Sequence, residues 1–139
     1  MSDTHDPQAS DAETEEQLIE LAGRIFEAAR GGDAAALEAF LAAGAPVNLA
    51  NERGDTLLML AAYHGHAQAV RVLLQHGADP NQVNDRGQTP LAGTVFKGND
   101  EALDALLAGG ADPHAGQPSA FATAQMFQKD ELLARFAQQ

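Results

Sequence analysis

The stretch Gly54-Asp-Thr-Leu-Leu-Met-Leu-Ala-Ala-Tyr-His-Gly-His66 decides the fold of this 139-residue chain, because its pattern returns 33 residues later. Gly87-Gln-Thr-Pro-Leu91 repeats its beginning, and Gly98 stands where Gly65 stands in the earlier copy. The run Gly77-Ala-Asp-Pro80 likewise returns one period further on. Self-similarity at a fixed period of this length is the signature of stacked structural repeats.

Each copy predicts two short helices joined by turns. Asn51-Glu-Arg-Gly54 and Asn84-Asp-Arg-Gly87 are tight turns, because Asn can hydrogen-bond its own backbone and Gly tolerates the last position. Pro90 opens a helix, since the first helical turn does not need its missing N–H. We expect Gly65 and Gly98 to end these first helices in a left-handed conformation. Helices this short are unstable alone, so each must stack on the neighbouring unit.

Composition excludes several classes of protein. There are 20 Asp and Glu against 8 Lys and Arg, which gives a formal net charge of −12, and there is no Cys. Disulfides, Cys-ligated zinc and thiol nucleophiles are therefore absent. The negative charge disfavours binding to nucleic acid and to anionic membranes. With 5% aromatic residues and no Trp, the core should consist mostly of Ala, Leu and Val.

The charge is concentrated at the N-terminus, where residues 1–20 hold seven acids and no Lys or Arg. We expect a disordered acidic tail over 1–13, and a repeat domain over 14–139 whose first helix begins at the capping box Thr14-Glu-Glu-Gln17. The opening residues lack the features of a secretory signal, and no run of 18 apolar residues occurs. These features predict a cytoplasmic protein.

The repeated units resemble the ankyrin repeat, whose pattern includes Thr-Pro-Leu-His-x-Ala-Ala, Gly-His, Val-x-x-Leu-Leu and Gly-Ala-x-x-Asn. The resemblance covers about residues 14–136. It implies an all-α solenoid of helix-turn-helix units with β-turn fingers. About four units are expected: an N-terminal cap (14–50), two repeats (51–83 and 84–116) and a truncated C-terminal cap (117–139). Gly93 lies within a predicted helix, where it costs about 0.5–1 kcal/mol relative to Ala.

In ankyrin repeats the partner usually meets the finger tips and the exposed ends of the first helices, which form a concave face. Carrying these positions over places five of the eight basic residues on that face. The resemblance therefore implies a non-enzymatic, monomeric interaction module whose basic and aromatic concave face binds an acidic segment of another protein. The candidate partner-binding residues are Arg30, Arg53, Asp55, Tyr63, His64, Arg86, Gln88, Phe96, Lys97, Phe121 and Lys129.

A structural explanation of the same residues stays open at this point. Arg53 and Arg86 could simply solvate the finger tips, and Phe96 could pack under the next repeat. Two other functions also stay open: an inhibitor or immunity-type protein whose acidic outer surface masks a basic active site, or an accessory factor of a haem enzyme such as catalase. The acidic tail could also fold over the basic face and compete weakly with the partner.

Catalysis and cofactor binding find no support in the sequence. Ser119 has no His placed beside it by the repeat register, and no Gly-rich phosphate-binding motif occurs. His64 and His66 suggest a metal site, but the intervening Gly65 is expected to turn their side chains in different directions. We therefore expect no enzyme activity, no cofactor and no metal.

Overall fold

The computed structural model describes the backbone of residues 7–138 and the side chains of residues 14–138. Within this range the chain forms helices and no extended strand. The helices are α1 (Pro7–Gly31), α2 (Ala34–Ala42), α3 (Leu57–Tyr63), α4 (Ala67–Gln75), α5 (Pro90–Lys97), α6 (Asp100–Ala108), α7 (Ala120–Met126) and α8 (Asp130–Phe136).

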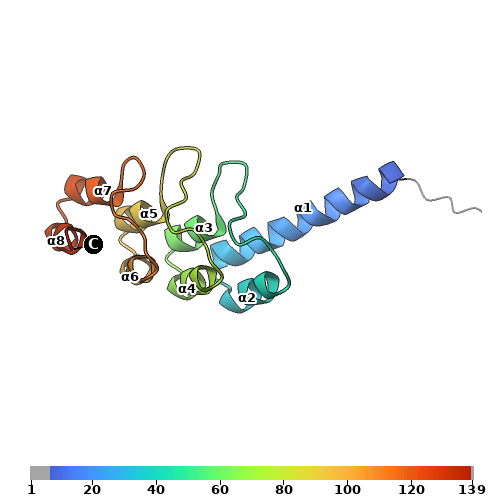
Figure 1. Ribbon diagram of the computed structural model, residues 1–139, viewed down its shortest axis with the longest axis horizontal. Helices are drawn as coiled ribbons and strands as arrows, with labels where there is room; N and C mark the ends of the chain where they lie inside the picture. The colour runs from blue at the N-terminus through green and yellow to red at the C-terminus, as the bar shows by residue number, and fades with distance from the viewer. Residues whose placement is uncertain (1–6, 139) are drawn as a thin grey trace, which may run out of the picture.

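The helices form two stacked rows, with long loops rising on one side (Figure 1). The first row contains α3, α5 and α7 together with the C-terminal part of α1, and each of these contacts the next. In the second row α2 contacts α4, and α4 contacts α6. Each first-row helix also packs on the second-row helix that follows it in the chain. This arrangement confirms the expected all-α repeat solenoid.

The ends of the helices follow the sequence signals. Thr56 and Thr89 are the N-cap residues of α3 and α5, and their hydroxyls accept hydrogen bonds from backbone N–H groups three residues on, at 3.1 and 3.2 Å. Gly65 and Gly98, which follow these helices, have φ angles of 78° and 74°. The expectation that both glycines are left-handed is therefore confirmed.

The core lies between the two rows and is built mainly from Ala, Leu and Val, as the composition predicts. Leu58 and Leu91, at equivalent positions of α3 and α5, are almost completely buried. Thr94 is buried as well, and its hydroxyl donates a 2.6 Å hydrogen bond to the carbonyl oxygen of Leu91. The core is continuous from α1 to α8 because every unit buries its apolar face on the next.

Helix α1 is longer than the sequence predicts. It begins at Pro7, so Thr14 lies inside the helix and the expected capping box at Thr14 is wrong. Ala, Glu and Gln residues around Thr14 favour a helix, and a proline is tolerated in its first turn. Residues 7–13 of the expected disordered tail are thus helical, while residues 1–6 lie outside the described residues.

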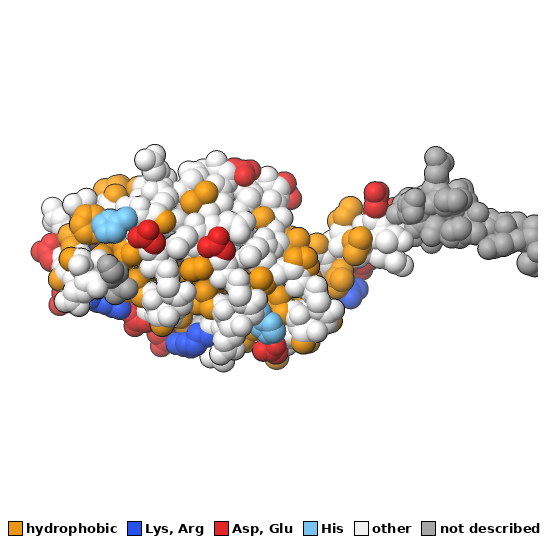
Figure 2. Space-filling view, in the orientation of Figure 1, with side chains coloured by type: hydrophobic (Ala, Val, Ile, Leu, Met, Phe, Trp, Pro, Cys, Tyr) orange, Lys and Arg blue, Asp and Glu red, His pale blue; other side chains and the backbone are white. Residues whose placement is uncertain are grey.

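The N-terminal half of α1 extends beyond the solenoid (Figure 1). Apolar and acidic side chains lie next to each other on this projecting part (Figure 2). Leu18 and Ile19 are 59% and 72% exposed, whereas Ile25 is buried against the rest of the core. Among the α1 residues whose side chains are described, those in the C-terminal half therefore provide the packing against the core.

The last unit departs from the 33-residue period. Its N-cap residue is Ser119, which stands 30 residues after Thr89 and bonds the N–H of Ala122 at 3.0 Å. The missing three residues come from the finger, which in this unit lacks the Asn-Asp-Arg tip. All positions after the finger are consequently shifted by three relative to the expected alignment.

Candidate functional site

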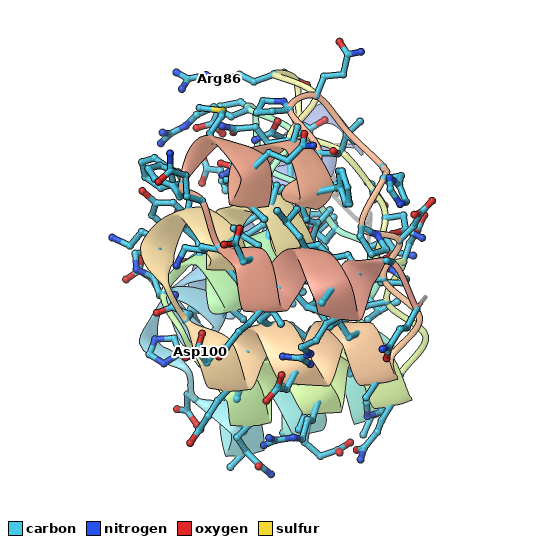
Figure 3. The ribbon with its side chains drawn as sticks, turned by 90° about the vertical axis from the view of Figure 1, so that its left-hand side faces the viewer. Arg86 and Asp100 are labelled. Carbon is cyan, nitrogen blue, oxygen red and sulfur yellow. The ribbon has the colours of Figure 1, made fainter. Side chains whose placement is uncertain are left out.

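Asparagine side chains shape the two long fingers, which are the loops that precede α3 and α5. In the first finger, the Asn51 side-chain oxygen accepts hydrogen bonds from the N–H groups of Arg53 and Asp55 at 2.9 and 3.0 Å. Asn84 does the same for Arg86 and Gln88 in the second finger. These bonds fix the turn so that each arginine stands at a finger tip. In Figure 3 the Arg86 side chain extends beyond the ribbon at this end of the molecule.

The fingers are joined to each other as well. The N–H of Asp85 donates to the carbonyl oxygen of Arg53 at 3.0 Å. The Asn84 side-chain amide donates to carboxylate and amide oxygens of Asp55 and Gln88, both at 2.8 Å. Asp55 therefore connects the two fingers, and Gln88 stabilises the second finger. Both are among the predicted binding residues.

A hollow of about 450 Å³ lies between the fingers and the ends of the first-row helices. It is lined by seven of the predicted binding residues, which come from both fingers and from the ends of α1 and α3. These residues are Arg30, Arg53, Asp55, Tyr63, His64, Arg86 and Gln88. The structure thus brings together most of the predicted site.

The charge of this hollow is mixed rather than uniformly basic. Glu52 and Asp85 line it together with the arginines. Arg30 forms an ion pair with Glu27 on its own helix, which reduces the charge that Arg30 can offer to a partner. In contrast, Arg53 and Arg86 form no ion pair within the described part of the chain, and neither does Lys97.

Aromatic and methionine side chains gather where α3, α5 and α7 end. Tyr63 and Phe96 are 40% and 62% exposed, so the expectation that Phe96 is available on the surface holds. The Phe96 and Phe127 rings meet edge to face, with centroids 5.9 Å apart. The ammonium group of Lys97 lies 5.0 Å from the centre of the Tyr63 ring, within the range of a cation–π interaction.

Two predicted residues lie elsewhere because of the three-residue shift. Lys129 is the N-cap residue of α8 and matches Asn99, so its expected position beside Tyr63 and Phe96 is wrong. Phe121 lies in the first turn of α7 rather than at a finger tip, and it packs on the ring of His114. The residues that actually continue the row are Met126 and Phe127.

The sequence contained the signal that finds this shift. Ser119 is a good N-cap residue, followed by an Ala-rich apolar run, and aligning it with Thr89 gives an offset of 30 instead of 33. Met126 then matches Phe96, and Gln128 matches Gly98. The equivalence of Gln128 is visible in its backbone, because its φ angle is 54°, in the region of the repeat glycines.

The histidines of the motif have structural contacts. The His64 and His66 rings stack with centroids 6.3 Å apart, so they do not point in different directions as expected. The Nε2 atom of His66 is 2.7 Å from the carbonyl oxygen of Arg30 and ties α1 to the following unit. Among the residues with described side chains, no group of three or more His, Asp or Glu is arranged to hold a metal ion.

Within residues 7–138, none of the helices combines the length and the apolar character needed to cross a lipid bilayer.

Comparison with known proteins gives the same result as the fold. A family model described as ankyrin repeats (3 copies) matches residues 25–117, which is more than half of the chain. A curated ankyrin repeat protein of Pseudomonas aeruginosa is 47% identical over 64 residues, which are 46% of this chain and 34% of that protein. The match thus spans about a third of the length of this relative.

Ankyrin repeats generally mediate protein–protein interaction, and the family is typically non-enzymatic. The helix pairs, the fingers and the family match agree with one another: the chain belongs to the ankyrin repeat family.

Proposed function

We propose that this protein binds an acidic segment of another protein through its concave face, which comprises the two finger tips and the C-terminal ends of α3, α5 and α7. One observation carries the proposal. Three basic side chains without ion-pair partners in the described chain, Arg53, Arg86 and Lys97, lie around the exposed ring of Tyr63. The exposed Phe96 lines the adjoining hollow together with Tyr63.

These residue types suit an acidic peptide. Guanidinium groups bind carboxylates through two parallel hydrogen bonds, which adds direction to the charge attraction. Tyrosine and arginine are enriched among the residues that dominate binding energy. The acids between the arginines, Glu52 and Asp85, make the face selective, because they repel carboxylates that are not aligned with the bases.

Asp55 and Gln88 line the hollow and also hold the fingers in place. Both accept hydrogen bonds from the Asn84 side chain. The bond to Asp55 couples the second finger to the first, and the bond to Gln88 lies within the second finger. His64 lies against Tyr63, with ring centroids 5.5 Å apart and the rings nearly perpendicular. This contact holds the tyrosine ring at the rim of the hollow.

Affinity capture followed by mass spectrometry tests the proposal. The wild-type protein is compared with a charge-reversed Arg53→Glu/Arg86→Glu variant and with Arg71→Glu, a matched change on α4 of the second row. We expect a partner that wild type and Arg71→Glu capture and that the finger variant loses. An acidic fragment of the captured partner, added in excess, should displace the full-length partner from the protein.

Other outcomes decide against the concave face. Capture kept by the finger variant would place binding away from the concave face. An inhibitor whose acidic outer surface masks a basic site should then bind at least as tightly after Arg71→Glu, because this change makes the outer helices more acidic. A Tyr63→Ala/Phe96→Ala variant provides a second test. It should lose capture while its melting temperature stays close to that of wild type, since both rings are substantially exposed.

A further inference from the structure

Helix α5 carries small residues where α3 carries large ones. Ala92 and Gly93 occupy the positions that Met59 and Leu60 occupy one repeat earlier. A second hollow of about 290 Å³ opens over these small residues, between α3 and α7. Its lining is largely apolar and consists of Met59, Tyr63, Gln88, Thr89, Ala92, Gly93, Phe96, Pro118, Thr123, Met126 and Phe127.

The backbone does not require glycine at position 93. Gly93 lies inside α5 with ordinary helical geometry and does not have a positive φ angle. A Cβ atom there would have its nearest neighbour, a ring carbon of Tyr63, at 3.7 Å, which is a normal contact. Glycine in a helix interior is less stable than alanine. Glycine at position 93 instead keeps the floor of the hollow open, because it has no side chain to fill that space.

The walls of the hollow remain exposed although they are apolar. Phe96, Met126 and Phe127 are 62%, 68% and 47% exposed, and together with Tyr63 they form a contiguous patch. Contiguous exposed apolar patches on a monomer mark interaction sites. The edge-to-face pair of Phe96 and Phe127 leaves its outer surface open to a further ring.

The hollow is continuous with the charged hollow between the fingers. Met59, Tyr63 and Gln88 line both. Lys97 stands at the shared rim, above the Tyr63 ring, and Arg86 stands on the finger next to Gln88. A single extended segment can therefore place one apolar side chain over Gly93 and its carboxylates near Lys97 and Arg86.

We propose that Gly93 opens an anchor pocket that takes one phenylalanine side chain of the acidic partner segment. This inference rests on the proposed function. The pocket is at the lower end of the size range of ligand sites, which suits a single ring. Aromatic and methionine walls favour an aromatic anchor, because rings pair edge to face and thioethers contact ring edges.

The test uses four synthetic peptides of one length, labelled with a fluorophore and measured by fluorescence anisotropy. Each carries Phe or Ala at its centre, flanked on both sides by Glu or by Gln. Wild type should bind the Phe/Glu peptide at least about tenfold more tightly than the Ala/Glu peptide. It should also bind the Phe/Glu peptide more tightly than the Phe/Gln peptide, which reports the charge contribution separately.

Two substitutions close the pocket. Gly93→Leu restores the residue found one repeat earlier and should remove the advantage of Phe over Ala. Gly93→Ala, whose added methyl group fits without a clash, should reduce that advantage partly while raising the melting temperature. The matched control is Gly23→Ala in α1, which gains the same helix propensity away from the hollow and has no atom within 4 Å of the new methyl group. This control should keep wild-type binding.

The outcomes separate this proposal from the function on which it rests. Equal binding of Phe and Ala peptides, with Glu still preferred to Gln, overturns the anchor pocket and leaves acidic-segment binding in place. A Phe preference that Gly93→Leu abolishes, without any Glu preference, supports the pocket and overturns the acidic partner. Absence of binding by every peptide up to about 1 mM overturns both.

Discussion

At the residue scale, Gln128 is the position where sequence and backbone disagree most. It is the one non-glycine residue with a positive φ angle among those the structure describes, and it takes the place of Gly32, Gly65 and Gly98 in the earlier units. The sequence predicted a left-handed conformation for Gly65 and Gly98, because glycine adopts this conformation without steric cost. It gave no comparable signal for Gln128, since glutamine has no preference for that region.

Replacing Gln128 by Gly should therefore stabilise the protein. Relief of left-handed strain is worth about 1–2 kcal/mol, and the greater flexibility of glycine in the unfolded chain offsets about 0.5–1 kcal/mol of it. We expect a net gain of up to about 1.5 kcal/mol in the free energy of unfolding, measured by urea denaturation. Gly98→Ala adds a side chain at the equivalent left-handed position. It should destabilise the protein by about 1 kcal/mol through the left-handed conformation alone, because the new Cβ atom meets no neighbour. Destabilisation by Gln128→Gly would contradict this assignment.

At the scale of the helix and the finger, side-chain amides connect consecutive units. The Asn48 side-chain oxygen accepts a hydrogen bond from the N–H of Asp79 at 2.9 Å, and Asn81 accepts one from the N–H of Asp112 at 2.7 Å. Asn81→Ala leaves that N–H without its protein partner and should cost about 0.5–1.5 kcal/mol of unfolding free energy. Val83→Ala, at a half-exposed neighbouring position, should change it by less than about 0.5 kcal/mol. Equal effects of the two variants would show that the amide bond contributes nothing.

Helix α1 offers a second test at this scale, because its two halves have opposite environments. Ile25 is 3% exposed and belongs to the core, whereas Ile19 on the projecting half is 72% exposed. Ile25→Ala should cost about 2–4 kcal/mol by creating a cavity, and Ile19→Ala less than about 0.5 kcal/mol. The same chemical change on one helix thus separates packed from projecting residues. A large loss for Ile19→Ala in thermal or urea unfolding would mean that the projecting half is covered.

At the scale of the whole molecule, the 33-residue period predicted the fold and the finger positions correctly as far as Phe96 and Lys97. It failed beyond the third unit, because a shortened finger changes the period without disturbing the helices that stack on either side. The hollow over Gly93 was also beyond reach, since the sequence showed only the cost of a glycine in a helix. That this glycine leaves space depends on the neighbouring helices.

Charge acts on the whole molecule in two opposite ways. A net charge of −12 on 139 residues repels itself in the folded state, so added salt should raise the melting temperature. The same screening should weaken attraction between an acidic partner and Arg53, Arg86 and Lys97, with Kd rising about tenfold between about 50 and 500 mM NaCl. Differential scanning fluorimetry and anisotropy with the Phe/Glu peptide measure the two quantities in the same buffers. Sucrose, which is uncharged, should leave Kd nearly unchanged. A Kd that does not rise with salt would remove the electrostatic basis of the proposed interaction while leaving the apolar pocket to account for binding.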